Sequence, residues 1–150
     1  VYTARERLPL AGLYRGDGKP TPEGLTMRLL KMEYARTVQQ IYDQAEYQKV
    51  TEHNYIRERI GKKRMYGAFI GEQLAGIVGI HNDDSIGMLY VLEPYRGRHI
   101  GKALYTYMIN KMLALDWMPY SQIMVGDEVN THLQQSLGMY MSKTPIIWLD

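Results

Sequence analysis

The 150-residue sequence contains no cysteine, and this absence excludes disulfide bonds and thiolate metal sites. A chain without thiols is compatible with a reducing compartment, so we expect a cytoplasmic location. The four histidines are scattered without the spacing of metal ligands, and we therefore expect no metal site.

Long hydrophobic runs and a strong net charge are absent as well. No segment reaches the length of a membrane span, and no apolar core follows a basic start as in a signal peptide, so we expect no membrane partner. A net charge of +2 is too small to predict binding to nucleic acid. Hydrophobic residues make up 45% of the chain, which suits one compact domain with its own core.

The first 24 residues differ from the rest of the chain. Prolines and glycines are concentrated there, which predicts an extended arm or loop over residues 1–24 with room for one short strand. Residues 25–150 then form the expected domain. The sequence begins at Val1 rather than at methionine, which fits a trimmed chain and also the later part of a longer protein.

The hydrophobic pattern of the domain predicts alternating strands and helices, in the order β-α-α-β-β-β-α-β-α-β. This order indicates an α/β (α+β) fold, with a mixed sheet and helices on its faces. Strands are predicted at 25–30, 64–71, 74–82, 86–92, 121–125 and 140–149, and helices at 32–45, 51–63, 98–115 and 128–138. The apolar face of the longest helix is predicted at Ile100, Ala103, Leu104, Tyr107, Met108, Met112 and Leu115.

The stretch "LEPYRGRHIGKAL" joins a predicted strand to the longest predicted helix. Its glycines, Gly97 and Gly101, allow an anion to approach the backbone closely. The first N–H groups of a helix have no partners inside the helix, and the helix dipole favours negative charge there. With Arg96, Arg98 and Lys102 nearby, the turn is suited to hold a phosphate or pyrophosphate.

Two common phosphate-binding loops do not fit this turn. A P-loop requires G-x-x-x-x-G-K-[ST], whereas the segment from Gly97 to Ala103 is one residue short and lacks the hydroxyl that binds magnesium. The dinucleotide fingerprint G-x-G-x-x-G is absent. A surface turn whose basic residues are merely solvated is the alternative, and the turn alone does not decide between the two interpretations.

The segment "YVLEPYRGRHIGKAL" resembles motif A of the GNAT acyltransferase superfamily, R/Q-x-x-G-x-G/A, which spans a strand, a loop and a helix. Arg96 and Gly101 match the first and last positions of the motif. His99 stands where the family usually has its first glycine. A side chain at this position narrows the pyrophosphate site, although the backbone N–H of His99 is still available to an anion.

The resemblance covers roughly residues 25–149. "LTMRLLKMEYARTVQQIYD" is similar to the family's first strand and helix, and "YGAFIGEQLAGIVGIH" is similar to its central hairpin. "SQIMVGDEVNTHLQQSLGM" is similar to a later segment, N-x-x-S-x-x-L-x-x-x-L-G-F, with Asp127 and Asn130 at the Asn and Ser positions. The implied sheet is mostly antiparallel. Within the superfamily, the chain looks most like the glycine N-acyltransferase-like branch.

The resemblance implies direct transfer of an acyl group, in the first place acetyl, from acyl-CoA to the amine of a small molecule or peptide. In the family, two parallel strands splay apart, and the pantetheine of CoA pairs with one of them. A backbone N–H near Val91 is expected to polarise the thioester carbonyl. The implied cofactor-binding residues are Leu89, Tyr90, Val91, Arg96, Gly97, Arg98, His99, Ile100, Gly101, Lys102, Asp127 and Asn130.

Transfer to an amine also requires groups that move protons. The family often has a tyrosine acid at the position of Gln134, which cannot serve as an acid; Tyr140 and Tyr120 are the candidate substitutes, and CoA thiolate also leaves well without an acid. His81 and Asp84 are candidate bases, although "HNDDS" is equally an ordinary polar turn. The predicted catalytic residues are therefore Asp84, His81 and Tyr140.

A second function, from a different class, fits the departures from the family pattern at His99, Asp127 and Gln134. A non-catalytic domain with this fold could bind acyl-CoA as a ligand or mediate contact with a protein partner. Binding of CoA without acyl transfer to a broad panel of amines would favour it. The assembly is left open, with a homodimer as one option.

Overall fold

The computed structural model describes residues 2–3, 24–44 and 54–142, and it confirms the predicted order of elements between residues 25 and 141. The strands are β1 (Tyr2–Thr3), β2 (Leu25–Leu29), β3 (Met65–Ile70), β4 (Gln73–Ile80), β5 (Ile86–Val91), β6 (Tyr120–Ser121) and β7 (Tyr140–Met141). The helices are α1 (Ala35–Gln44), α2 (Tyr55–Gly61), α3 (Ile100–Ala114) and α4 (Glu128–Ser136), with 3₁₀ turns at Met32–Tyr34 and Glu93–Tyr95.

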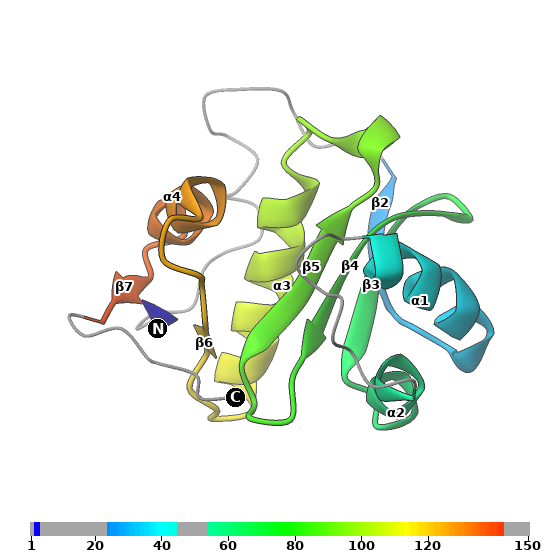
Figure 1. Cartoon of the computed structure of the whole chain (residues 1–150), viewed down its shortest axis with the longest axis horizontal. Helices are drawn as coiled ribbons and strands as arrows, with labels where there is room; N and C mark the ends of the chain where they lie inside the picture. Colours follow the sequence, from blue (N-terminus) through cyan, green and yellow to red (C-terminus); the bar gives the residue numbers. More distant parts are fainter. Residues whose placement is uncertain (1, 4–23, 45–53, 143–150) are drawn as a thin grey trace.

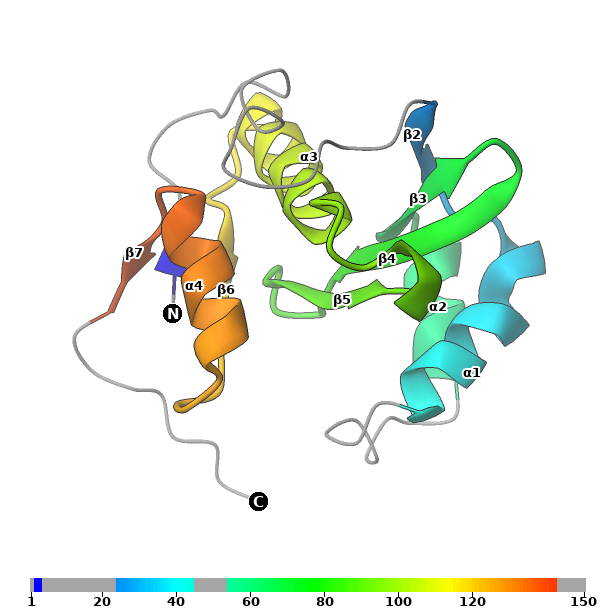
Figure 2. The ribbon, with the colours of Figure 1, turned by 90° about the horizontal axis from the view of Figure 1, so that it is seen from above.

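The described strands form one mixed sheet in the order β2-β3-β4-β5-β6-β1-β7. Five of its six neighbouring pairs are antiparallel, and the pair of β5 and β6 is parallel. Helices α1 and α2 lie on one face of the sheet and α3 lies on the other, while α4 lies beside β6 (Figures 1 and 2). The predicted fold class, a mostly antiparallel sheet flanked by helices on both faces, is confirmed.

Strand β1 is the part of the predicted arm that the structure describes. It lies between β6 and β7 and pairs antiparallel with both, so the short strand expected in this region is present. Residues 4–23 lie outside the described part of the chain, and the domain boundary at residue 24 stays a prediction.

Two hydrophobic clusters lie on opposite faces of the sheet. The first packs α1 and α2 against the sheet, and it includes the buried residues Ala35, Val38, Ile41 and Tyr42, which recur at helical spacing along α1. The second packs α3 against the other face and includes Leu137 and Met139, which follow α4. The sheet is therefore covered on both faces, as a mixed sheet requires.

Helix α3 is buried on more sides than its sequence pattern predicts. Tyr105, Thr106 and Ile109 lie outside the predicted apolar face and are buried, whereas Leu115 lies on that face and is 56% exposed. The sheet covers one side of α3, and residues that follow α4 join the same core from another side. A helix enclosed in this way does not need a polar stripe. The sequence of α3 therefore gives little indication of which side of the helix faces the sheet.

The strand predicted at 121–125 is much shorter in the structure and begins one residue earlier. Strand β6 ends at Ser121, and Met124 and Val125 are exposed. A strand needs a neighbour to satisfy its backbone, and β6 pairs with β5 at one residue before the two separate. For the last predicted strand, 140–149, the structure describes its start as β7, and residues 143–150 lie outside the described part.

We predict that Gly67→Ala destabilises the fold, because Gly67 lies in the middle of β3 under close side chains. A Cβ at this position would lie 2.8–2.9 Å from carbons of Leu74, Leu30 and Phe69. Overpacking of this kind costs roughly 1–3 kcal/mol. Urea titration should show this loss for Gly67→Ala and no loss for the control Gly61→Ala, whose Cβ would have ordinary contact, 3.7 Å, with Met32. Equal stability of the two variants would contradict the packing described here.

Candidate functional site

The parallel strands β5 and β6 pair at one position, where Ile86 lies opposite Ser121. From there the two strands diverge, as Figure 1 shows along the length of β5. On its other side, β5 pairs with β4 as far as Val91. Among the described strands, none pairs with this second edge of β5 beyond Ile86. The backbone groups that face this edge, apart from the Val91 carbonyl that accepts from Arg96 Nε, are therefore available to an extended ligand.

A β-bulge interrupts β5 at the start of this open edge. Gly79 pairs with Gly87 and Ile77 pairs with Tyr90, so two steps along β4 correspond to three along β5. The extra residue is accommodated at Met88, whose φ of 53° is unusual for a residue with a side chain. As a result, positions 87 and 88 both face the α1–α2 side, where regular strand residues would alternate.

The turn after β5 is held in place by its own side chains. The 3₁₀ turn at Glu93–Tyr95 is anchored to β4 because the Tyr95 hydroxyl donates to Gln73 Oε1 at 2.6 Å. Arg96 Nε donates to the Val91 carbonyl at 2.9 Å, and its guanidinium lies 5.3 Å from the centre of the Tyr90 ring. These contacts fix the path of the chain between β5 and α3.

Helix α3 begins without a side-chain cap. Its N-cap residue, His99, has a left-handed backbone with φ of 61°, and the first helical bond runs from Ala103 N–H to His99 O at 3.0 Å. The N–H groups of residues 100–102 precede this bond and have no acceptor inside the helix. The helix start offers these backbone donors, and Gly97 with φ of 76° precedes it, which is the geometry that an anion site requires. The anion site itself stays a prediction.

The predicted cofactor-binding residues fall into three groups. Leu89, Tyr90 and Val91 lie on the open β5 edge, and the residues from Arg96 to Lys102 form the turn and the first turn of α3. Ile100 is 1% exposed, so its backbone rather than its side chain can meet a ligand. On α4, Asp127 Oδ1 accepts the Asn130 N–H at 3.1 Å, which makes Asp127 the N-cap of that helix.

Gly101 has room for a larger side chain. A Cβ at this position would lie 3.5 Å from Val91 and 3.8 Å from Leu89, which is ordinary van der Waals contact, and its φ is not positive. Glycine in a helix costs about 1 kcal/mol relative to alanine. Neither packing nor backbone conformation therefore requires glycine at this position. The predicted approach of an anion to the backbone would require it.

His81, a predicted catalytic residue, forms a pair with a tyrosine that the sequence interpretation missed. Tyr55 Oη lies 2.6 Å from His81 Nδ1, and the two rings are stacked with their centres 5.9 Å apart. The other ring nitrogen, Nε2, faces Gly87 on β5, where a Cβ would lie 2.3 Å away. Tyr55 lies on α2, and His81 directly follows β4. The pair therefore connects α2 to β4, beside the bulge in β5.

The electrostatic environment keeps His81 neutral near pH 7. Burial lowers the pKa of His81 below its usual 6.5, and Arg59 acts in the same direction, while Asp83 opposes it. Burial also raises the pKa of Tyr55, so its phenol keeps its proton. A neutral imidazole with one nitrogen held by a phenol and the other facing β5 can accept a proton.

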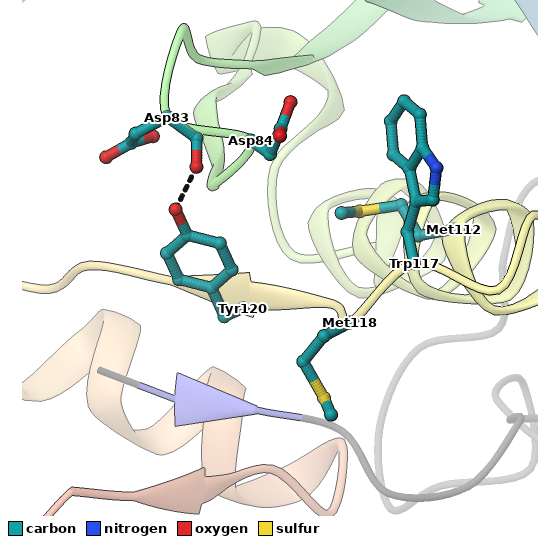
Figure 3. A pocket seen from close by; sticks show the side chains of 6 residues that line it. All are labelled: Asp83, Asp84, Met112, Trp117, Met118 and Tyr120. Atoms are coloured by element: carbon teal, nitrogen blue, oxygen red, sulfur yellow. Dashed lines mark hydrogen bonds between the residues drawn. The ribbon is translucent and has the colours of Figure 1, made fainter.

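Asp84, another predicted catalytic residue, lies on the opposite side of the sheet from His81. It lines an open pocket of about 420 Å³, shown in Figure 3, together with Asp83, Met112, Trp117, Met118 and Tyr120. The Tyr120 hydroxyl donates to the Asp83 backbone carbonyl across the mouth of this pocket. Asp83 accepts from Ser85 Oγ at 2.6 Å and from Gln122 Nε2 at 2.7 Å, so it holds the turn together.

Tyr140, the third predicted catalytic residue, is 52% exposed on β7. Strands β6 and β1 lie between β7 and β5 in the sheet, so Tyr140 is not next to the open edge. The structure therefore does not bring the three predicted residues together. It places His81 on the α2 side of β5, Asp84 on the α3 side and Tyr140 near one end of the sheet.

No group of three or more metal-ligating side chains gathers among the residues that the structure describes. None of the helices within that part of the chain has the length and apolar character needed to cross a membrane.

We predict that Gly87→Ala displaces the His81 ring, because the new Cβ would overlap Nε2 and Cδ2. The displaced ring meets more water, so the pKa of His81 should rise towards 6.5. An NMR titration of the His81 ring proton measures this change, with Gly101→Ala as a control that leaves it unaltered. An unchanged pKa in Gly87→Ala would show that the ring does not lie over β5.

The same shift predicts how stability depends on pH. Because the native pKa of His81 is lowered, the unfolded chain takes up the proton first as the pH falls below 6.5. The free energy of unfolding should therefore decrease from about pH 6.5 downwards, through the native pKa of His81. Gly87→Ala should show a smaller decrease over this interval, measured by urea titration at several pH values.

Comparisons with known proteins agree with this geometry. Residues 27–141 match the model of the acetyltransferase (GNAT) family. No curated protein matches the chain by sequence. Among solved structures, a Drosophila protein superposes with a TM-score of 0.71 at 16% identity, over 94% of this chain and 46% of its own. The chain thus spans less than half the length of that protein.

Two further solved structures resemble the chain. The ribosomal-protein-alanine N-acetyltransferase of Brucella melitensis has a TM-score of 0.65 at 17% identity, covering 84% of this chain and 97% of its own. The PaiA N-acetyltransferase of Thermoplasma acidophilum, solved in complex with coenzyme A, has a TM-score of 0.59 at 18% identity, covering 80% and 92%. Identities this low establish a shared fold.

The family match covers more than half of the chain and confirms the membership predicted from motif A. The family named by this match is one of acetyltransferases, in agreement with the predicted enzyme class. The glycine N-acyltransferase-like branch and the individual site residues stay predictions. The chain belongs to the acetyltransferase (GNAT) family.

Proposed function

We propose that the chain holds acyl-CoA along the open edge of β5 and transfers its acyl group directly to an amine of a small molecule or peptide. The observation that carries this proposal is the single pair between β5 and β6, which leaves the β5 edge open above the free N–H groups of α3. An extended chain ending in a pyrophosphate fits both features at once.

The residues for holding CoA follow from this arrangement. Between Leu89 and Val91 alternate backbone groups face the open edge, where the Val91 carbonyl is held by Arg96 Nε, and the remaining groups suit the amides of pantetheine. The N–H groups of residues 100–102 suit the pyrophosphate. Arg98 and Lys102 add positive charge beside the same turn. CoA supplies the acyl group as an activated thioester, and a backbone N–H of this edge polarises its carbonyl.

His81 is the proposed general base. With its proton on Nδ1, the imidazole donates to Tyr55 Oη, which leaves the lone pair of Nε2 free on the β5 side. Its neutral state at pH 7 allows it to remove a proton from an incoming ammonium group, directly or through a water. The acceptor amine therefore approaches β5 from the face covered by α1 and α2.

The finer assignments belong to this proposal as well. The acyl group is proposed to be acetyl, since the family is named for that activity. A cytoplasmic location is proposed from the absence of cysteine, and a homodimer remains one option for the assembly. The branch similar to glycine N-acyltransferases is proposed from the sequence resemblance.

We predict that Gly101→Glu weakens acetyl-CoA binding by more than about tenfold, because the carboxylate repels the pyrophosphate. A glutamate near a helix N-terminus is favourable for the helix, so the variant should remain folded. Gly101→Gln is the matched control, with similar size and no charge, and it should bind more tightly than Gly101→Glu.

Calorimetric titration with acetyl-CoA measures the effect, with ATP and NAD as comparison ligands for the unaltered chain. Wild-type affinity for acetyl-CoA in Gly101→Glu would show that the anion site lies elsewhere. Binding of acetyl-CoA without transfer to any amine in a broad panel would favour a non-catalytic acyl-CoA-binding domain.

We predict that His81→Gln lowers kcat by roughly 10²–10⁴ at neutral pH, the usual contribution of a general base. In the unaltered enzyme, kcat should stay constant down to pH 6.5 and fall below it, as the pH passes through the lowered pKa of His81 and the imidazole becomes protonated. The His81→Gln variant should not show this fall of kcat at low pH. The control Asp84→Asn should keep both the wild-type kcat and its fall at low pH. A low kcat without the fall in Asp84→Asn, together with wild-type behaviour of His81→Gln, would assign the base to Asp84.

A further inference from the structure

Two side chains one turn apart on α2, Tyr55 and Arg59, reach the end of β4, where His81 lies. The hydroxyl oxygen of Tyr55 lies 2.6 Å from Nδ1 of His81. Arg59 Nη1 donates to the carbonyl of Ile80, the residue before His81, at 3.2 Å. The same helix therefore contacts both the ring of His81 and the backbone that carries it.

Arg59 is a buried cation whose contacts hold α2 on the sheet. It is 4% exposed, and its guanidinium lies 5.7 Å from the centre of the Tyr55 ring. Its Nη2 donates to Glu58 Oε1 at 3.0 Å, so the charge has a partner. Ile56 and Ile60 of the same helix are buried in the hydrophobic cluster on this face. Because separating a buried charge from its partners is strongly destabilising, α2 is fixed in its position over the sheet.

The ring of His81 has two orientations that its own backbone does not distinguish. Rotation of the ring by half a turn exchanges Nδ1 with Cδ2 and Nε2 with Cε1. In the structure, Nδ1 meets the Tyr55 oxygen and Nε2 faces Gly87. In the rotated ring, the carbon Cδ2 would meet the Tyr55 oxygen, and the carbon Cε1 would take the place of Nε2. The hydrogen bond to Tyr55 therefore favours the orientation in which Nε2 faces β5.

The same contact bears on which ring nitrogen carries the proton. Among the residues that the structure describes, none accepts a hydrogen bond from Nε2 of His81, whereas the Tyr55 oxygen lies at hydrogen-bond distance from Nδ1. Tyr55 is less deeply buried than His81, so its own hydroxyl proton can be donated to water. A proton on Nδ1 thus lets both groups donate, and it leaves the lone pair of Nε2 free.

We propose that Tyr55 is a positioning residue for acyl transfer, whose hydroxyl fixes the ring orientation and the tautomer of His81. The inference rests on the proposed function, because it takes His81 as the general base. Tyr55 acts through the imidazole and does not contact the substrate. Arg59 supports it by tying α2 to the carbonyl that precedes His81.

The kinetic test compares Tyr55→Phe with Tyr34→Phe, because both tyrosines are partly buried and pack against the same hydrophobic cluster. Tyr55→Phe keeps the ring and removes the hydroxyl. Its kcat should fall roughly tenfold with little change in KM, which corresponds to the loss of one hydrogen bond. Tyr34→Phe should keep the kcat of the unaltered chain. An unchanged kcat in Tyr55→Phe would overturn the inference.

A double variant separates positioning from a general effect on the fold. If Tyr55 acts through His81, then Tyr55→Phe should cause no further loss of kcat in a chain that already carries His81→Gln. A second tenfold loss in the double variant would show that Tyr55 acts independently of His81 and would refute the proposal.

A long-range ¹⁵N–¹H NMR spectrum of the His81 ring, recorded at a pH well above 6.5, reads the tautomer directly. The unaltered chain and Tyr34→Phe should show the proton on Nδ1 alone, and Tyr55→Phe should show a mixture of both tautomers. A mixture in the unaltered chain would overturn the inference even if Tyr55→Phe does not fold. A proton on Nε2 alone would overturn both the inference and the assignment of the base.

Failure of the inference can be told apart from failure of the proposed base. If His81→Gln loses activity and Tyr55→Phe retains it, the role of Tyr55 is wrong and His81 remains the base. If His81→Gln keeps the kcat of the unaltered chain, the proposed base is wrong and the inference fails with it.

Discussion

The pairing of β5 with β6 at a single residue is the constraint on which the rest of the structure depends. If Ile86 and Ser121 were followed by further pairs, the sheet would be continuous and its middle would have no open backbone. Because the pairing stops there, the edge of β5 remains open up to Val91, where the chain turns into α3. Within the six residues of β5, the end at Ile86 is therefore closed by pairing with β6, and the end at Val91 is open.

The two faces of the sheet contribute different chemistry to this opening. On the face covered by α2, His81 and Tyr55 lie against Gly87, next to the bulge at Met88. On the face covered by α3, Tyr105 lies at the carbonyl of Ile86. The two faces of the sheet therefore place different polar side chains beside β5.

The features that depend on neighbouring residues in sequence could be predicted. The turn after β5 and the start of α3 were recognisable from "RGRHIGKAL", since glycines, basic residues and a helix start are local signals. The bulge at Met88 carries no such signal, because a methionine in a strand does not indicate a positive φ. Tyr55 and Tyr105 were missed because each meets its partner through tertiary packing, and Tyr105 lies off the apolar stripe of its helix.

His99 has a consequence for how a ligand meets the turn. Its left-handed backbone costs roughly 1–2 kcal/mol for a residue with a side chain, and contacts on either side of it, from Arg96 and from α3, keep it in that conformation. This conformational cost arises when the chain folds and not when a ligand binds. If the turn binds an anion as proposed, that anion meets a backbone already in its final conformation, so little conformational entropy is lost on binding.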